Sequence, residues 1–387
     1  MNDFNFNTTP GIIFGKGASV NSCDRIIDKL GDNIFVITDA DLTKIELNKP
    51  IINQISKSSN LEVFDDVESD PSKKTLIKAL KSAKNFKPTG ILGFGGGSSM
   101  DIAKLVSLLM GTKQDIDNIW GVGNAKGPRL PLVLVPTTAG TGSEVTPISI
   151  ITVEDNEKKG VSTPIILPDL AVLDPELTLN LPSDITAATG VDAMVHAIEA
   201  YTSINQNNNP ISKLLAIEAL KLLGSSIETA VFDGQNIEAR KNMLLGSMMA
   251  GQAFANSPVS AVHALAYPIG GIFHIPHGLS NSLILPHVLK FNSINPKACE
   301  QYAFLAPFIF KDINLKTNNQ IICNDFIERL ENLSSLLQIP SKLRDIDIPK
   351  EACAKMAKES MKQTRLLVNN PREVTEEDAF NIYNAAW

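Results

Sequence analysis

The chain has 387 residues, of which 43% are hydrophobic and 20% are charged, and its formal net charge is −7. Single hydrophobic cores stop growing near ~250–300 residues, so this length predicts two domains, and the ordinary composition excludes disordered and fibrous classes. Acids and bases are mixed along the chain and no Lys/Arg run exceeds a pair, which argues against nucleic acid as a partner.

The N-terminal sequence MNDFNFNTTPGIIFG lacks the basic and apolar regions of a secretory signal. No apolar run approaches the ~18–20 residues needed to cross a bilayer. The four cysteines are scattered without C-x-x-C spacing, as is usual for reduced thiols. We therefore expect a cytoplasmic protein without a membrane partner.

Short apolar runs bounded by Gly, Pro or Asp alternate with helical patterns in the first half of the chain. Such runs are typical of strands buried on both faces of a parallel sheet. We predict strands over residues 33–39, 61–67, 90–96, 131–137 and 170–174. The segments between them with three- and four-residue apolar spacing predict helices over residues 19–30, 71–86 and 98–111. The alternation indicates a Rossmann-like, doubly wound α/β sheet.

The second half reads differently, because strand-like runs largely disappear after about residue 181. Helical patterns follow one another there, over residues 211–232, 236–255 and 324–338. The boundary falls in the proline-punctuated stretch DPELTLNLP. We predict an α/β domain over residues 1–180 that binds a dinucleotide, and an all-helical domain over residues 181–387 that binds metal and substrate.

Two loops of the first half are candidates for binding a dinucleotide. GFGGGSSMDIAK (93–104) has three consecutive glycines, Gly95 to Gly97, at the end of a strand and the start of a helix, where backbone N–H groups and the helix dipole favour a phosphate. A capped glycine turn would explain it equally well. The next strand leads into the hydroxyl-rich loop PTTAGTGSEVT (136–146), on the same edge of the sheet. The first predicted strand ends at Asp39, whose carboxylate favours the ribose of NAD over that of NADP.

GVDAMVHAIEAY (190–201) places Asp192 and His196 one helical turn apart among apolar residues. Alone, the pair is explained by an ordinary hydrogen bond in a core. The other four of the five histidines, however, lie in AVHALAYPIGGIFHIPHGLSNSLILPHV (261–288), and this clustering makes a metal site a serious alternative. One carboxylate with two or three imidazoles suits Fe(II) or Zn(II). Glu199 is a rival ligand, ranked lower as a group behind the ligands or on the helix surface.

These segments resemble the iron-containing (group III) alcohol dehydrogenase family. The blocks GFGGGSSMDIAK, PTTAGTGSEVT, ITAATGVDAMVHAIEAY, VHALAYPIGGIFHIPHG and NNPREVTEEDA occur in the family's order over nearly the whole chain. The resemblance implies metal ligands at Asp192, His196, His263 and His277, in a catalytic site between the domains. It also implies NAD contacts at Asp39, Gly96, Gly97, Ser98, Asp101, Thr137, Thr138, Thr141 and Lys158.

The chain departs from the family pattern at two positions. The family usually has a histidine four residues after the third ligand, where this chain has Tyr267, and often an asparagine where this chain has Asp70. A tyrosine with a pKa of ~10 is a poorer proton shuttle at neutral pH than an imidazole. Tyr267 and His274 are the candidate catalytic side chains, and His274 is the alternative proton relay.

The resemblance implies an NAD-dependent, metal-activated alcohol dehydrogenase or aldehyde reductase, with Fe(II), or alternatively Zn(II), as the ion. Its substrate would be a small primary alcohol, a diol or an ω-hydroxy acid. A zinc polyol dehydrogenase, a dehydroquinate synthase-like enzyme, a metal hydrolase and a scaffold that binds NAD without chemistry are the alternatives. The family also suggests a homodimer, in which FNFNTTPGIIFG (4–15) pairs across subunits or forms an ordinary edge strand.

Overall fold

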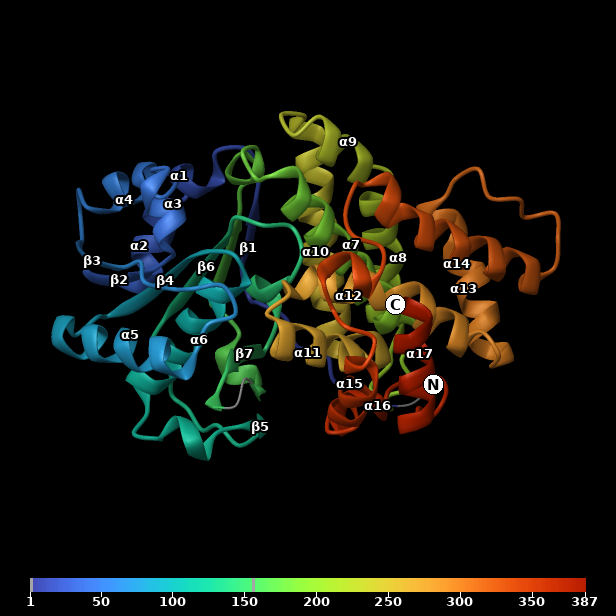
Figure 1. Cartoon of the computed structure of the whole chain (residues 1–387). Helices are drawn as coiled ribbons and strands as arrows, with labels where there is room; N and C mark the ends of the chain where they lie inside the picture. Colours follow the sequence, from blue (N-terminus) through green and yellow to red (C-terminus); the bar gives the residue numbers. More distant parts are fainter. Residues whose placement is uncertain (1–2, 155–156) are drawn as a thin grey trace. The chain divides into compact units, whose positions relative to one another are not determined.

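The computed structural model describes residues 3–154 and 157–387. The chain forms two compact units (Figure 1). Asn7–Asn180 form one unit, and Leu181–Trp387 form the other together with the N-terminal residues up to Phe6. Each unit has its own core and is described separately below.

A six-stranded parallel sheet forms the centre of the first unit, with the strand order β1-β9-β6-β4-β2-β3. Its strands are β1 Ile12–Phe14, β2 Asn33–Ile37, β3 Asn60–Phe64, β4 Gly90–Gly95, β6 Leu132–Pro136 and β9 Leu170–Leu173. All five pairings between neighbouring strands are parallel. The carboxyl ends of β2, β4 and β6 therefore lie side by side at one edge of the sheet.

Helices cover both faces of this sheet, as Figure 1 shows. They are α1 Ala18–Asn21, α2 Cys23–Leu30, α3 Ala40–Lys44, α4 Lys49–Ile55, α5 Lys73–Phe86 and α6 Gly97–Gly111. Alternate residues of the central strands enter opposite cores. Ile91 packs with residues of α5 and α6, whereas Leu92 and Phe94 pack with residues of α2 and α4. This alternation of buried side chains confirms the predicted doubly wound α/β class.

A second, three-stranded sheet in this unit was not predicted. Its strands are β5 Gly121–Val122, β7 Ile148–Thr152 and β8 Lys158–Ser162. β7 and β8 pair antiparallel, and β5 adds to β8 in parallel. β8 has the sequence KKGVS, whose two lysines and glycine give no strand signal.

The second unit is helical, as predicted, and no strand occurs among its described residues. Its helices are α7 Ser183–Thr202, α8 Pro210–Gly224, α9 Ile227–Phe232, α10 Ile237–Asn256, α11 Ala261–Phe273, α12 His277–Asn292, α13 Pro296–Ile309, α14 Asn319–Leu336, α15 Ala352–Ser360, α16 Thr364–Leu367 and α17 Glu376–Ala386. The single helix predicted over 211–232 is two helices. A Cβ on Gly224 would lie 2.6 Å from the Cα of Ile309, so the close approach of α13 requires glycine where α8 ends.

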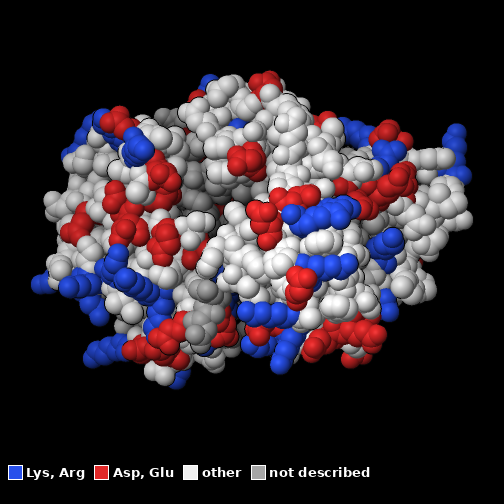
Figure 2. Space-filling model, in the orientation of Figure 1, with Lys and Arg blue, Asp and Glu red and all other residues white. Residues whose placement is uncertain are grey.

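Three further expectations concern the N-terminal strand, membrane-spanning helices and the distribution of surface charge. The stretch predicted to pair across subunits or to form an edge contains β1, which is the edge strand beside β9. No helix in the described parts of the chain is both long and apolar enough to span a membrane. Figure 2 shows Lys and Arg side chains interspersed with Asp and Glu on the face in view.

Candidate metal centre and dinucleotide loops

Three helices of the second unit bring the predicted metal ligands together. α7 contributes Asp192 and His196, α11 contributes His263, and α12 begins at His277. α11 ends where His274 adopts a left-handed conformation with φ 57°, and Pro276 is the N-cap of the next helix. This tight connection returns the chain so that His277 meets His263, with ring centroids 5.3 Å apart.

The four side chains form a compact, largely buried cluster. Their ligand atoms all lie within 4.8 Å of one another. Asp192, His196 and His263 are each less than 5% exposed, whereas the His277 side chain is 35% exposed. Oδ1 of Asp192 lies 3.8 Å from Nε2 of His277 and 4.0 Å from Nε2 of His263. His277 is thus the most exposed member of the cluster.

The electrostatics of the cluster favour a cation. Burial lowers the pKa of His196 to about 4 against the opposing effect of Asp192, so its imidazole is neutral at pH 7. Burial alone would raise the pKa of Asp192. The three histidines and a hydrogen bond from Asn281 outweigh burial, and the pKa lies below its ordinary value. An ionised carboxylate and a neutral imidazole are the forms that bind a divalent metal.

Glu199 lies behind the cluster rather than on a helix surface. It is 2% exposed, and its Oε2 is 2.6 Å from Nδ1 of His263. Its Oε1 accepts hydrogen bonds from Ser260 Oγ at 2.8 Å and from the Val262 backbone N–H at 2.7 Å. Burial would raise the pKa of this carboxyl, but these contacts hold it below its ordinary value. Glu199 therefore orients His263.

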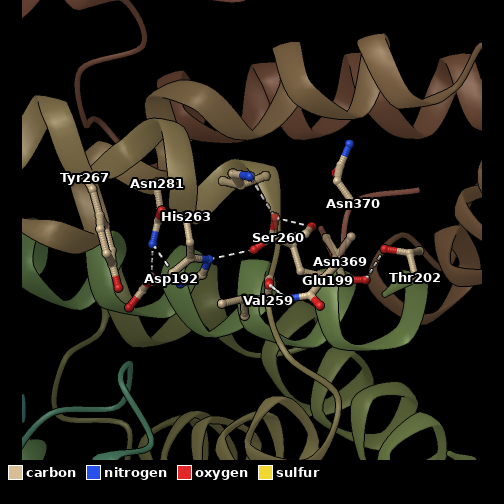
Figure 3. A network of polar contacts seen from close by, with 12 residues as sticks. Asp192, Glu199, Thr202, Val259, Ser260, His263, Tyr267, Asn281, Asn369 and Asn370 are labelled. Carbon is tan, nitrogen blue, oxygen red and sulfur yellow. Dashed lines mark hydrogen bonds and ion pairs between the residues drawn. The ribbon is translucent and has the colours of Figure 1, made fainter. Parts of the chain in front are cut away.

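Asn281 is a member of the site that sequence reasoning missed. Figure 3 shows its amide directed at Asp192 and His263. Its Nδ2 lies 2.6 Å from Asp192 Oδ1 and 3.2 Å from Nε2 of both His263 and His277. Because it follows His277 by one helical turn, its position on the same helix face could have identified it.

The residues present fit a divalent cation. Among the described residues, His196 Nδ1 and Asn281 Oδ1 are buried without a hydrogen-bond partner. Two polar atoms at the cluster therefore lack the partner that buried polar atoms usually have. Ligands at ~2.0–2.2 Å from one ion lie at most ~4.4 Å apart, so the widest pair would close by roughly half an ångström. The donor set of one carboxylate and three imidazoles suits iron or zinc.

Of the two predicted catalytic side chains, Tyr267 lies beside the cluster and His274 lies outside it. Tyr267 is 8% exposed, and its ring centroid lies 6.1 Å from that of His277. Its hydroxyl accepts a hydrogen bond from Arg365 Nη2 at 3.3 Å. His274 is exposed at the C-cap of α11 and is outside the cluster. A relay through His274 stays a prediction.

The predicted dinucleotide loops converge in the first unit, at the carboxyl ends of neighbouring strands. Added Cβ atoms would lie 2.8 Å from Thr141 Cγ2 at Gly97 and 3.6 Å from the side chain of Thr138 at Gly96. Thr137 joins the loops through its backbone N–H, which donates to Gly95 O at 3.0 Å. The glycine loop leaves no room for a side chain at Gly97, and backbone N–H groups remain at the start of α6.

Asp39 reaches the same edge from β2. Its carboxylate caps α3 by accepting a hydrogen bond from the Leu42 backbone N–H at 2.9 Å. A Cβ at Gly95 would lie 3.5 Å from Asp39 Oδ2. Burial raises the pKa of Asp39 above its ordinary value. The carboxylate therefore lies beside the glycine loop, and its contact with NAD stays a prediction.

Asp101 binds the hydroxyl-rich loop and strand β7 through hydrogen bonds to its carboxylate. It accepts hydrogen bonds from Ser143 Oγ at 2.7 Å and from the Ile150 backbone N–H at 2.8 Å. Lys104, fully buried one turn later, donates to Ser143 Oγ at 2.7 Å. Burial lowers the pKa of Lys104 to about 8. Lys104 was not predicted as part of this group, although its spacing from Asp101 in an apolar helix is a usable signal.

Ser98, Asp70 and Lys158 form a second polar group beside the glycine loop. Ser98 Oγ accepts a hydrogen bond from the Asp70 backbone N–H at 3.3 Å, and the Asp70 carboxylate pairs with the Lys158 ammonium. The carboxylate that replaces the family's usual asparagine thus neutralises the lysine expected to reach a phosphate. Contact of these side chains with a cofactor stays a prediction.

Comparisons with known proteins agree with both halves of this description. A family model described as iron-containing alcohol dehydrogenase matches residues 9–175. A second, described as Fe-containing alcohol dehydrogenase family, C-terminal, matches residues 186–387. Together they cover most of the chain, which belongs to the iron-containing alcohol dehydrogenase family. The family and enzyme class predicted from the sequence motifs are confirmed.

Individual relatives span nearly the whole chain. Long-chain-alcohol dehydrogenase 1 of Geobacillus thermodenitrificans is 37% identical over 372 residues, covering 93% of this chain and 91% of that protein. The structure of an alcohol dehydrogenase from Oenococcus oeni matches with a TM-score of 0.94 and 31% identity over 100% of both chains. A sulfoacetaldehyde reductase from Bifidobacterium kashiwanohense, solved with NAD+, matches with a TM-score of 0.87 and 28% identity over 99% of this chain and 98% of that one.

Proposed function

We propose that this alcohol dehydrogenase transfers a hydride between a primary alcohol and NAD, with Asp192, His196, His263 and His277 holding Fe(II), or alternatively Zn(II). The observation that supports the proposal most is the cluster of these four ligand atoms within 4.8 Å. Iron or zinc bound there supplies Lewis acidity, which lowers the pKa of an alcohol hydroxyl. Binding of the cofactor, orientation of the substrate and transfer of the proton are left to the protein's own residues.

The role proposed for residues 1–180 is to bind the dinucleotide. Gly96 and Gly97 would present backbone N–H groups to the pyrophosphate at the start of α6, where the helix dipole is positive. Thr137, Thr138 and Thr141 would position the nicotinamide end, and Asp39 the adenosine ribose. Asp101 would act indirectly, because both of its carboxylate oxygens are already bonded to the loop and to its neighbours.

The role proposed for residues 181–387 is to bind metal and alcohol. In the oxidative direction a carbon–hydrogen bond breaks, its electron pair leaves with the hydride for the nicotinamide, and the hydroxyl proton goes to solvent. Tyr267 is proposed to orient the substrate or to carry this proton, since its ring lies beside His277. His274 remains the alternative for the proton, from its exposed position.

The names of the relatives do not agree on the part of the substrate that lies away from the reacting alcohol or aldehyde group. One is a dehydrogenase of long-chain alcohols, and another reduces sulfoacetaldehyde, whose far end is an anionic sulfonate. The reacting alcohol or aldehyde group is what their substrates share. We also propose that the protein works in the cytoplasm as a homodimer, an expectation that comes from the family.

Change of NADH absorbance on adding alcohols or aldehydes tests the proposal. The purified protein is stripped of metal and reloaded with Fe(II), Zn(II) or neither. We expect turnover with primary alcohols and NAD only after loading. Turnover of esters or amides without NAD would instead indicate a metal hydrolase, and no turnover of any alcohol or aldehyde would overturn the proposal.

A further inference from the structure

An arginine lies next to the metal centre without taking part in it. Arg365 is in the short helix α16, and its Nη2 donates to the hydroxyl of Tyr267 at 3.3 Å. Tyr267 in turn lies beside the candidate ligand His277, with ring centroids 6.1 Å apart. Figure 3 shows the hydroxyl end of Tyr267 directed toward Asp192. One side chain therefore separates this guanidinium from the cluster.

The Arg365 guanidinium has no acidic partner among the described residues. Other arginines of the chain do: Arg129 pairs with Asp169 at 2.7 Å and Arg329 pairs with Asp312 at 2.8 Å. Arg365 is exposed, and its one side-chain hydrogen bond goes to the hydroxyl of Tyr267. A guanidinium has five N–H donors, so most of them remain available to a ligand.

Tyr267 fixes the direction of this charge. A free arginine side chain has many rotamers, and holding one of them costs entropy when a ligand binds. The phenol oxygen, itself in an 8% exposed residue, accepts from Nη2 and limits that freedom. The remaining N–H groups can then meet a carboxylate or sulfonate in the bidentate geometry that suits guanidinium.

We propose that Arg365 binds the anionic end of the substrate, so that the preferred substrates are short aldehydes and alcohols with a terminal carboxylate or sulfonate. The proposal rests on the proposed function and adds the substrate class. The oxygen to be reduced or oxidised would lie at the metal centre, and the charged end would lie at Arg365 beyond Tyr267. Arg365 would act on specificity and would leave the hydride step itself unchanged.

Matched aldehydes separate charge from chain length. 4-Oxobutanoate is compared with butanal, and sulfoacetaldehyde with propanal, in the metal-loaded enzyme with NADH. For the wild type we expect kcat/KM to be about 10- to 100-fold higher for at least one anionic aldehyde than for its neutral partner, as is typical of charge-assisted hydrogen bonds. The two anionic arms distinguish carboxylate from sulfonate.

Arg365→Ala should remove this preference by raising KM for the anionic aldehyde about 10- to 100-fold, while kcat/KM for the neutral aldehyde stays within about twofold. Arg365→Lys should keep part of the preference, because the charge remains but the bidentate geometry is lost. Arg329→Ala is the matched control, since it removes an arginine that already pairs with Asp312 and Asp325. It should leave both substrates unaffected.

A binding measurement separates this proposal from the proposed function. Calorimetric titration of the enzyme–NADH complex with butanoate reports the anion site without turnover. We expect Arg365→Ala to weaken butanoate binding at least tenfold. Equal kcat/KM for charged and neutral aldehydes in wild type and variant, or butanoate binding unchanged by Arg365→Ala, would overturn the role of Arg365. If no aldehyde or alcohol is turned over, the proposed function fails, and the titration still decides whether Arg365 binds anions.

Discussion

The carboxylate of Glu199 contacts Nδ1 of His263 at 2.6 Å, and both groups are almost completely buried. Since an ionised carboxylate only accepts hydrogen bonds, Nδ1 carries the proton and Nε2 keeps its lone pair. Nε2 is the atom on the side of Asp192. Glu199 thereby selects the tautomer of His263 that can bind a metal ion.

Replacing this carboxylate by an amide should weaken metal binding. Glu199→Gln keeps the size of the side chain but removes the charge that holds the imidazole, and changes of this kind typically cost ~10- to 100-fold in metal affinity. Competition with a chelator measures the effect, and circular dichroism checks the fold. Glu238→Gln, on the exposed surface of α10, is the matched control. Equal affinity in Glu199→Gln and wild type would show that Glu199 does not tune the site.

Removing a ligand should separate metal binding from cofactor binding. We expect His277→Ala to lose bound metal and turnover, while NADH binding measured by fluorescence stays within about twofold, because the dinucleotide loops belong to the other unit. His277 is partly exposed at the start of α12, so the fold should tolerate alanine. His287→Ala, on the same helix but outside the cluster, should keep its metal. Full metal content in His277→Ala would remove it from the ligand set.

Cofactor choice should depend on Asp39. Two unit charges ~4 Å apart repel by roughly 4 kcal/mol at the effective dielectric of a protein surface, and solvent should reduce this severalfold. Asp39→Gly would remove the repulsion of a 2′-phosphate and keep a residue type that is tolerated at an N-cap. We expect the NADP/NAD ratio of kcat/KM to rise at least tenfold. Asp41→Asn controls for the lost charge, and an unchanged ratio in Asp39→Gly would place the ribose elsewhere.

Stability should vary with pH through Glu144. Burial raises the pKa of this carboxyl from 4.5 to about 7. Between these values the folded chain binds more protons than the unfolded chain, so stability should fall as pH rises from about 4.5 to 7, by up to roughly 3 kcal/mol. Glu144→Gln cannot titrate and should lack this loss. Urea unfolding of both proteins at pH 5 and pH 8 measures it, and parallel changes in the two would contradict the assignment.

The features that the sequence predicted are those with a local signal. Apolar runs identified five strands of the parallel sheet, of which the edge strand β3 is only partly buried, and the spacing of Asp192 and His196 placed two candidate ligands on one helix face. The scarcity of histidine drew attention to His263 and His277. These signals depend on nearest neighbours along the chain or on composition, and tertiary packing did not alter them.

The features that the sequence did not predict depend on contacts between distant segments. Arg365 meets Tyr267 across 98 residues, and α13 passes so close to Gly224, the last residue of α8, that a side chain would not fit there. β7 and β8 are short runs of mixed polar and apolar residues, and each forms a strand by pairing with the other. Glu199 was expected as a group behind the ligands or on the helix surface, and only its hydrogen bonds to Ser260 and Val262 and its contact with His263 decide between these positions.

The way in which three helices share the ligand set affects how the protein acquires its ion. Zinc fingers fold only when metal arrives, whereas α7, α11 and α12 are held by apolar packing and by bonds from Glu199 and Asn281 that involve protein groups alone. Ion exchange therefore requires no refolding. The ion carried in a cell would then be set by supply and competition among divalent metals, and the same polypeptide could be isolated as an iron or a zinc enzyme according to its growth medium.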